Sequence, residues 1–294
     1  MGVSSGRIRA SARAIPVVCP MFGPFRRSRG RSRPGPEPDV RRSVETALER
    51  AAEGGSAPAL ARLDADATER LLALAARFLA TRRIEGAGGF EPDAALGARI
   101  AVEACLAVVN LPAGLDAYAR AKRVIVYPSG FLVEQRWTDE DGVEHEREAE
   151  LAGEAWDGGP VILAADDVEA SAPGFSVVVH EFAHVLDAAN GALNGFPDVV
   201  DPALRAAWPA TFDAASKALA EAVERGEIAP LDEYALEDPS EFFAVATETF
   251  LTDPVPLRRR WPELYALLAG FYGQDPAGRG CRHAGRPPRS RRPA

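Results

Sequence analysis

The segment that most constrains the fold of this chain is a largely apolar run, Ser176–Asp187, with the sequence SVVVHEFAHVLD. It contains no glycine or proline, and it is followed by Asn190-Gly191, a common signal at the C-terminus of a helix. We therefore expect a helix over 175–190. Because valine, phenylalanine, alanine and leucine surround its polar residues, the sequence also predicts that this helix is buried.

Two histidines, His180 and His184, lie one turn apart on this helix, with Glu181 between them. Residues four apart on a helix are separated by about 40° around the axis and about 6 Å along it. Two imidazoles at this spacing can bind one tetrahedral zinc ion, and Glu181 can act as general base on the zinc-bound water. The alternative is a helix with two ordinary surface or capped histidines. Burial favours the metal, because a buried imidazole needs a partner.

A catalytic zinc ion needs a third protein ligand, and the next histidine is His283, near the C-terminus. We therefore expect an acidic ligand from another helix. Asp238-Pro239 predicts a helix start, which makes Glu241 the third helical residue. By local rules Glu241 is a capping glutamate. The rival candidates are Glu248, seven residues further on the same face, and Glu237, before the helix.

Together these segments resemble the Mlc titration factor A family of bacterial zinc metallopeptidases. The likeness covers roughly 80–275 and, more loosely, 40–80. The matching pieces are His180-Glu181-Phe182-Ala183-His184, Leu186-Asp187, Tyr234-Ala235, Asp238-Pro239, Glu241-Phe242-Phe243-Ala244-Val245, Glu248, Phe250, Gly86-Ala87-Gly88-Gly89, Val126-Tyr127-Pro128 and Trp156-Asp157-Gly158-Gly159-Pro160-Val161.

The resemblance implies one zinc ion per chain, held by His180, His184 and Glu241, with Glu181 as the base. It implies that Tyr234 stands near the metal and stabilises the oxyanion, although Tyr234 alone could be an ordinary half-buried tyrosine. It also implies that Val161–Ala164 is an edge strand along which an extended peptide pairs. Asp187 is either a carboxylate that supports the site or an exposed helix acid.

Charge divides the chain into three parts. Residues 1–36 carry eight arginines and no acid, 276–294 carry six arginines and no acid, and the middle carries 20 basic and 43 acidic residues. We predict disordered basic tails over 1–38 and 276–294, and one metallopeptidase domain over 39–275. Met21 is an alternative start. The acidic body argues against direct binding of nucleic acid.

The apolar patterns predict an α+β, zincin-like domain that is mostly helical. Helical stripes cover 39–108, and short strands follow at Arg123–Tyr127, Phe131–Val133 and Val161–Ala164. His145 lies in an acidic run that is typical of a loop. Further helices are expected at 175–190, 203–225, 239–252 and 262–271.

Three cysteines, Cys19, Cys105 and Cys281, form no disulfide or metal pattern, and reduced thiols indicate the cytoplasm. Cys105 lies on an apolar helix face, which favours a core residue over a nucleophile. No apolar run is long enough to cross a membrane. The leading hypothesis is a cytoplasmic zinc endo- or aminopeptidase acting on peptides or proteins. The alternative is a non-catalytic module that sequesters a transcriptional repressor of sugar uptake, with structural or vestigial zinc.

Overall fold

A computed structural model describes residues 37–53, 57–129, 131–138, 144–151, 153–155 and 159–278. The predicted tails lie almost entirely outside these residues, and the domain boundaries at 39 and 275 stay a prediction. The described helices of eight or more residues are α1 (Glu37–Glu53), α2 (Ala65–Thr81), α3 (Ala94–Val108), α5 (Val177–Asp187), α6 (Pro202–Glu224), α7 (Pro239–Thr252) and α9 (Pro262–Tyr272). Short helices are α4 (Ala165–Glu169) and α8 (Pro254–Arg260).

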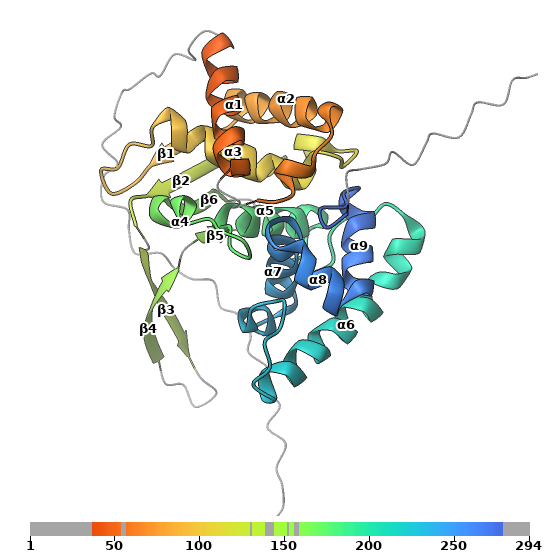
Figure 1. The fold of residues 1–294 in the computed structure, drawn as a ribbon. Helices are drawn as coiled ribbons and strands as arrows, with labels where there is room; N and C mark the ends of the chain where they lie inside the picture. Colours follow the sequence, from red (N-terminus) through yellow and green to blue (C-terminus); the bar gives the residue numbers. More distant parts are fainter. Residues whose placement is uncertain are drawn as a thin grey trace, which may run out of the picture. The chain divides into compact units, whose positions relative to one another are not determined.

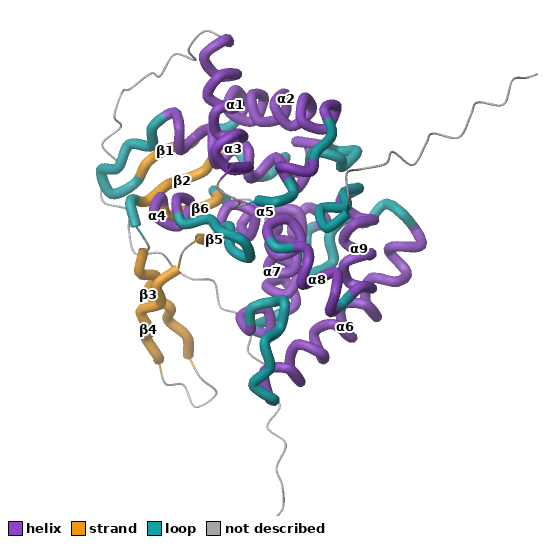
Figure 2. The backbone as a smooth tube through the Cα atoms, viewed as in Figure 1, coloured by secondary structure: helices purple, strands orange, loops and turns teal. Residues whose placement is uncertain are grey.

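A small sheet has the strand order β1-β2-β6-β5. Its strands are β1 (Arg83–Gly86), β2 (Arg123–Tyr127), β6 (Val161–Ala164) and β5 (Gly153–Ala155). The first three run parallel, whereas β5 runs antiparallel to β6. Figures 1 and 2 show this sheet beside a larger helical part, so the predicted α+β, mostly helical class is confirmed.

The sheet order corrects one expectation. Val161–Ala164 does form a strand, but β6 lies between β2 and β5 and is not an edge. Val161 to Leu163 pair with Val124 to Val126 on one side, and with 153–155 on the other. An extended peptide therefore finds no free backbone edge on β6.

Two further strands, β3 (Phe131–Thr138) and β4 (Glu144–Leu151), pair with each other in a sheet of their own. The chain divides near them, so that 132–151 falls in a different compact unit from the rest of the described residues. The strand predicted at Phe131–Val133 is thus longer than expected. His145, predicted in a loop, lies within β4.

The helix that carries the two histidines packs between α3 and α7 (Figure 1). Its core anchor is Phe182, which is fully buried and meets the rings of Phe78 and Tyr118 edge to face. Cys105 on α3 is also fully buried, and burial raises the pKa of its thiol, which suits a core residue. No helix within the described ranges is long and apolar enough to cross a membrane.

Candidate metal centre

The start of α5 fixes where its two histidines point. Ser176 caps the helix, and its hydroxyl accepts a hydrogen bond from the backbone N–H of Val179 at 3.2 Å. One turn on, the Nε2 atoms of His180 and His184 approach to 3.3 Å. His184 is buried and His180 is partly buried. The two imidazoles therefore face a common point at the edge of the core.

The start of α7 brings a carboxylate to the same point. Asp238 caps this helix by accepting hydrogen bonds from the backbone N–H groups of Ser240 and Glu241 at 2.7 and 3.1 Å. The Glu241 carboxylate then lies 3.1 Å from Nε2 of His180 and 3.4 Å from Nε2 of His184. The residue that local rules describe as a cap is thus directed at the histidines.

These separations fit a single metal ion. One donor atom from each of His180, His184 and Glu241 lies within 4.8 Å of the others. Donors about 2.1 Å from one tetrahedral ion lie about 3.4 Å from each other, close to the 3.1–3.4 Å found between these side chains. Two imidazoles and a carboxylate are also a donor set typical of catalytic zinc.

The pKa values show how strongly this cluster favours positive charge. Burial alone would lower the pKa of His180, but contacts with Glu241 and Glu248 and the charge of Glu181 raise it to about 10. Burial would raise the pKa of Glu241, whereas contacts with His180 and His184 lower it to about 2. A metal cation at this point would supply the positive charge that a proton on His180 otherwise supplies beside Glu241.

The rival acids occupy other positions. Glu237 is exposed. Glu248 is 6% exposed. Its Oε1 accepts a hydrogen bond from the backbone N–H of Ser176 at 2.5 Å, and its Oε2 lies 3.4 Å from Nδ1 of His180. It therefore holds the opposite nitrogen of the ring that Glu241 approaches.

Sequence reasoning missed the continuation of this network, which is Glu103 on α3. Glu103 is 1% exposed and accepts hydrogen bonds from the hydroxyl of Ser176 at 2.7 Å and from Arg99 at 2.9 Å. The available signal was a lone acid inside the apolar run Ile100–Val109, because a buried carboxylate needs a partner.

The two proposed catalytic side chains, Glu181 and Tyr234, lie on different elements. Glu181 follows His180 on α5 and is 4% exposed. Tyr234 lies on a short 3-10 helix, Glu233–Leu236, with its ring centroid 6.3 Å from that of His180. Tyr234 is 46% exposed. Burial and then the nearby carboxylates, Glu241 first, raise its pKa to about 12, so the phenol keeps its proton.

Asp187, at the end of α5, is fully buried and is not an exposed helix acid. Its carboxylate accepts hydrogen bonds from the backbone N–H groups of Asn194 and Gly195, both at 2.8 Å. Burial raises its pKa, although these backbone hydrogen bonds oppose the rise. Asp187 thus ties the C-terminus of the histidine helix to the loop that follows.

Comparison with known proteins identifies a metallopeptidase family. Residues 32–273 match the family described as glucose-regulated metallo-peptidase M90. Mlc titration factor A of Enterobacter sp. (strain 638) is 38% identical over 235 residues, which are 78% of this chain and 87% of the relative. The proteins of the same name from Salmonella gallinarum and Cronobacter sakazakii are each 38% identical, over 76% and 74% of this chain and 84% and 83% of theirs. This chain therefore belongs to the M90 family of metallopeptidases, together with Mlc titration factor A.

Proposed function

We propose that this chain is a zinc-dependent peptidase, and that His180, His184 and Glu241 hold one zinc ion. The observation that carries the proposal is the convergence of these three side chains, with Glu181 buried beside them. When bound by these three side chains, zinc would supply Lewis-acid chemistry and would make water more acidic at neutral pH.

The chain's own residues supply the proton transfers. Glu181 takes a proton from the attacking water while the water oxygen bonds to the carbonyl carbon of the peptide. It then gives this proton to the amide nitrogen as the carbon–nitrogen bond breaks. The products are an amine and a carboxylic acid, which loses its remaining proton to solvent at neutral pH. Tyr234 donates a hydrogen bond to the carbonyl oxygen while negative charge develops there.

Replacement of the base tests this assignment. Glu181→Gln removes the proton acceptor but keeps the size of the side chain, so kcat should fall roughly 100-fold to 10,000-fold while zinc content stays at about one per chain. Digestion of a peptide library by wild type and variant measures the change in kcat, and metal analysis measures the zinc content. His180→Ala should lose both zinc and activity. Full activity in Glu181→Gln would refute the mechanism, and the cleaved positions would separate endo- from aminopeptidase action.

The alternative function, capture of a repressor protein without catalysis, rests on the name of the relatives. "Mlc titration factor A" describes a factor that titrates another component, Mlc. A pull-down with Glu181→Gln as bait separates the two functions. Capture of the same protein by wild type and variant, with no peptide cleaved by wild type, would favour the alternative.

A further inference from the structure

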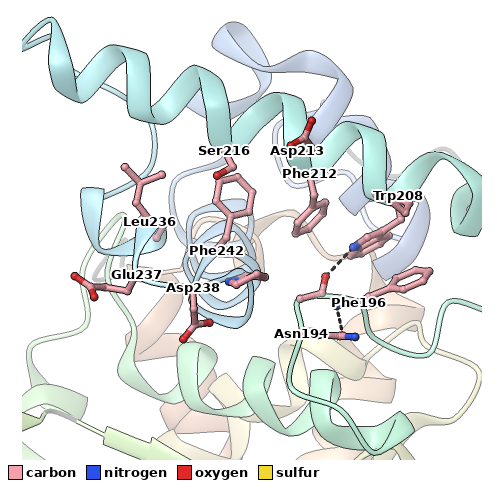
Figure 3. Close-up of a pocket in the computed structure, with 14 residues that line it drawn as sticks. Asn194, Phe196, Trp208, Phe212, Asp213, Ser216, Leu236, Glu237, Asp238 and Phe242 are labelled. Carbon is pink, nitrogen blue, oxygen red and sulfur yellow. Dashed lines mark hydrogen bonds between the residues drawn. The ribbon is translucent and has the colours of Figure 1, made fainter. Parts of the chain in front are cut away.

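A pocket of about 560 Å³ lies between α6, the loop at 194–196 and the segment 235–239 (Figure 3). Trp208, Phe212 and Ser216 reach into it from α6, and Leu236 and Phe242 from the opposite side. Large apolar side chains dominate its wall. Ring contacts set the shape of this wall, since Phe212 stacks on Trp208 with centroids 4.7 Å apart and meets Phe242 edge to face at 5.3 Å.

This pocket adjoins the metal centre along the chain. Ala235 lines the pocket and directly follows Tyr234, while Phe242 lines it and directly follows Glu241. The segments 234–235 and 241–242 therefore contribute both to this pocket and to the centre at which we place the reaction.

The polar groups of the wall are largely used within the protein. The indole N–H of Trp208 donates to the carbonyl of Gly195 at 2.8 Å, and the Asp238 carboxylate caps α7. Asp213 pairs with Lys217 at 2.7 Å, and the Asn194 side chain accepts from the backbone N–H of Phe196. A polar ligand would compete with these contacts, whereas an apolar one gains simply by leaving water.

The charged side chains that line the pocket disfavour one class of ligand. Three carboxylates among the lining residues are exposed, namely Asp213, Glu237 and Asp238. They would repel an acidic side chain or a phosphate group near the opening. The wall thus suits a large apolar group and disfavours an acidic one.

We propose that this pocket is a substrate subsite that takes a large apolar side chain, aromatic or leucine-like, of a residue beside the cleaved bond. The proposal rests on the peptidase function above and adds its substrate class. Alanine pentapeptides carrying one Phe, Leu or Asp, placed at each position in turn, are the probe. At one position Phe and Leu should raise kcat/KM at least tenfold over Ala, and Asp should lower it.

Filling the pocket tests the location of this preference. Ser216 is partly buried and lines the pocket, so Ser216→Phe, or the smaller Ser216→Leu, places an apolar group inside it. Ala214→Phe adds the same ring to an exposed position of α6 that is not among the lining residues. Ser216→Phe and Ser216→Leu should remove the advantage of Phe and Leu over Ala, whereas Ala214→Phe should retain it. All three variants should keep zinc.

The outcomes separate this proposal from the proposed function. If wild type cleaves peptides without any preference for Phe or Leu, or if both Ser216 variants keep that preference, the subsite is refuted and the peptidase stands. If wild type cleaves none of the peptides, the peptidase fails and the substrate subsite fails with it. Calorimetric binding of the Phe peptide to wild type and Ser216→Phe then decides whether the pocket binds apolar side chains at all.

Discussion

At the scale of single residues, Glu241 and Glu248 show which parts of a metal-ligand assignment can be predicted from residue spacing along a helix. The sequence places both on one face of a helix and leaves open which of them approaches the histidines. The structure brings each to a different nitrogen of the same ring, since Glu241 lies near Nε2 of His180 and Glu248 near Nδ1. Spacing along one helix could not separate these positions, because they depend on how α5 and α7 cross.

Glu248 gives a prediction at this scale. One of its oxygens accepts a hydrogen bond from the backbone N–H of Ser176, and the other lies near Nδ1 of His180. Nδ1 is the donor in this contact when Nε2 binds metal. Glu248→Gln has only one acceptor atom, so one donor loses its partner whichever way the amide turns. We expect the zinc dissociation constant to rise roughly 10-fold to 100-fold, as measured by competition with a chelating dye.

A purely structural role for Glu248 predicts something different. In that case Glu248→Gln would lower the melting temperature of the zinc-free protein while zinc affinity stayed unchanged. Glu248→Asp keeps two acceptor oxygens on a shorter side chain and should recover part of the affinity. Equal zinc affinity in wild type and Glu248→Gln would refute the positioning role.

At the scale of elements, the ends of the two site helices were well predicted from their caps. Asp238-Pro239 starts α7 as expected, and the histidine helix ends with a 3-10 turn at Asn190 before Gly191. Other elements escaped prediction because their own residues signal little. β1 has one aliphatic side chain, Ile84, and forms by pairing with β2. α8 has seven residues, two of them proline, and depends on burying Leu257.

The loop between α5 and α6 gives a prediction at this scale. Gly195 has φ +72° and lies so close to the start of α7 that an added Cβ would stand 2.2 Å from the carbonyl oxygen of Pro239. The Asp187 carboxylate accepts a hydrogen bond from the N–H of Gly195, and the indole N–H of Trp208 donates one to the carbonyl of Gly195. Gly195→Ala should therefore destabilise the fold by roughly 2 kcal/mol or more and shift α7, which carries Glu241. Urea unfolding and zinc titration measure the two effects.

Gly191 supplies a matched control in the same loop. Its φ is +95°, but an added Cβ would meet nothing within 4 Å. Gly191→Ala should therefore cost stability through backbone strain alone, about 1–2 kcal/mol, and leave zinc affinity unchanged. If both alanine variants bind zinc as wild type does, the contact of Gly195 with Pro239 does not set the position of Glu241.

At the scale of the whole molecule, sequence alone gave the fold class but not the order of the strands. The parallel strands come from 83–86, 123–127 and 161–164, and nothing local records that β2 lies in the middle of them or that β5 covers the outer side of β6. For this reason the prediction that Val161–Ala164 forms an edge strand was wrong. Pairing between distant segments is decided by the complete core, which a local pattern does not contain.

Removal of metal tests the centre through the stability of the entire fold. Both histidines lie on α5, whereas Glu241 lies on α7. An ion held by these three side chains would link two helices whose ligands are 61 residues apart in the sequence, as the contact of His180 with Glu241 shows. Zinc at 100 times its dissociation constant stabilises a protein by about 2.7 kcal/mol if it binds only the folded state. For a domain of this size we expect a chelator to lower the melting temperature by roughly 5–10 °C. Added zinc should restore it in wild type but not in His180→Ala, and a melting temperature that stays constant after verified zinc removal would contradict a metal held between the two helices.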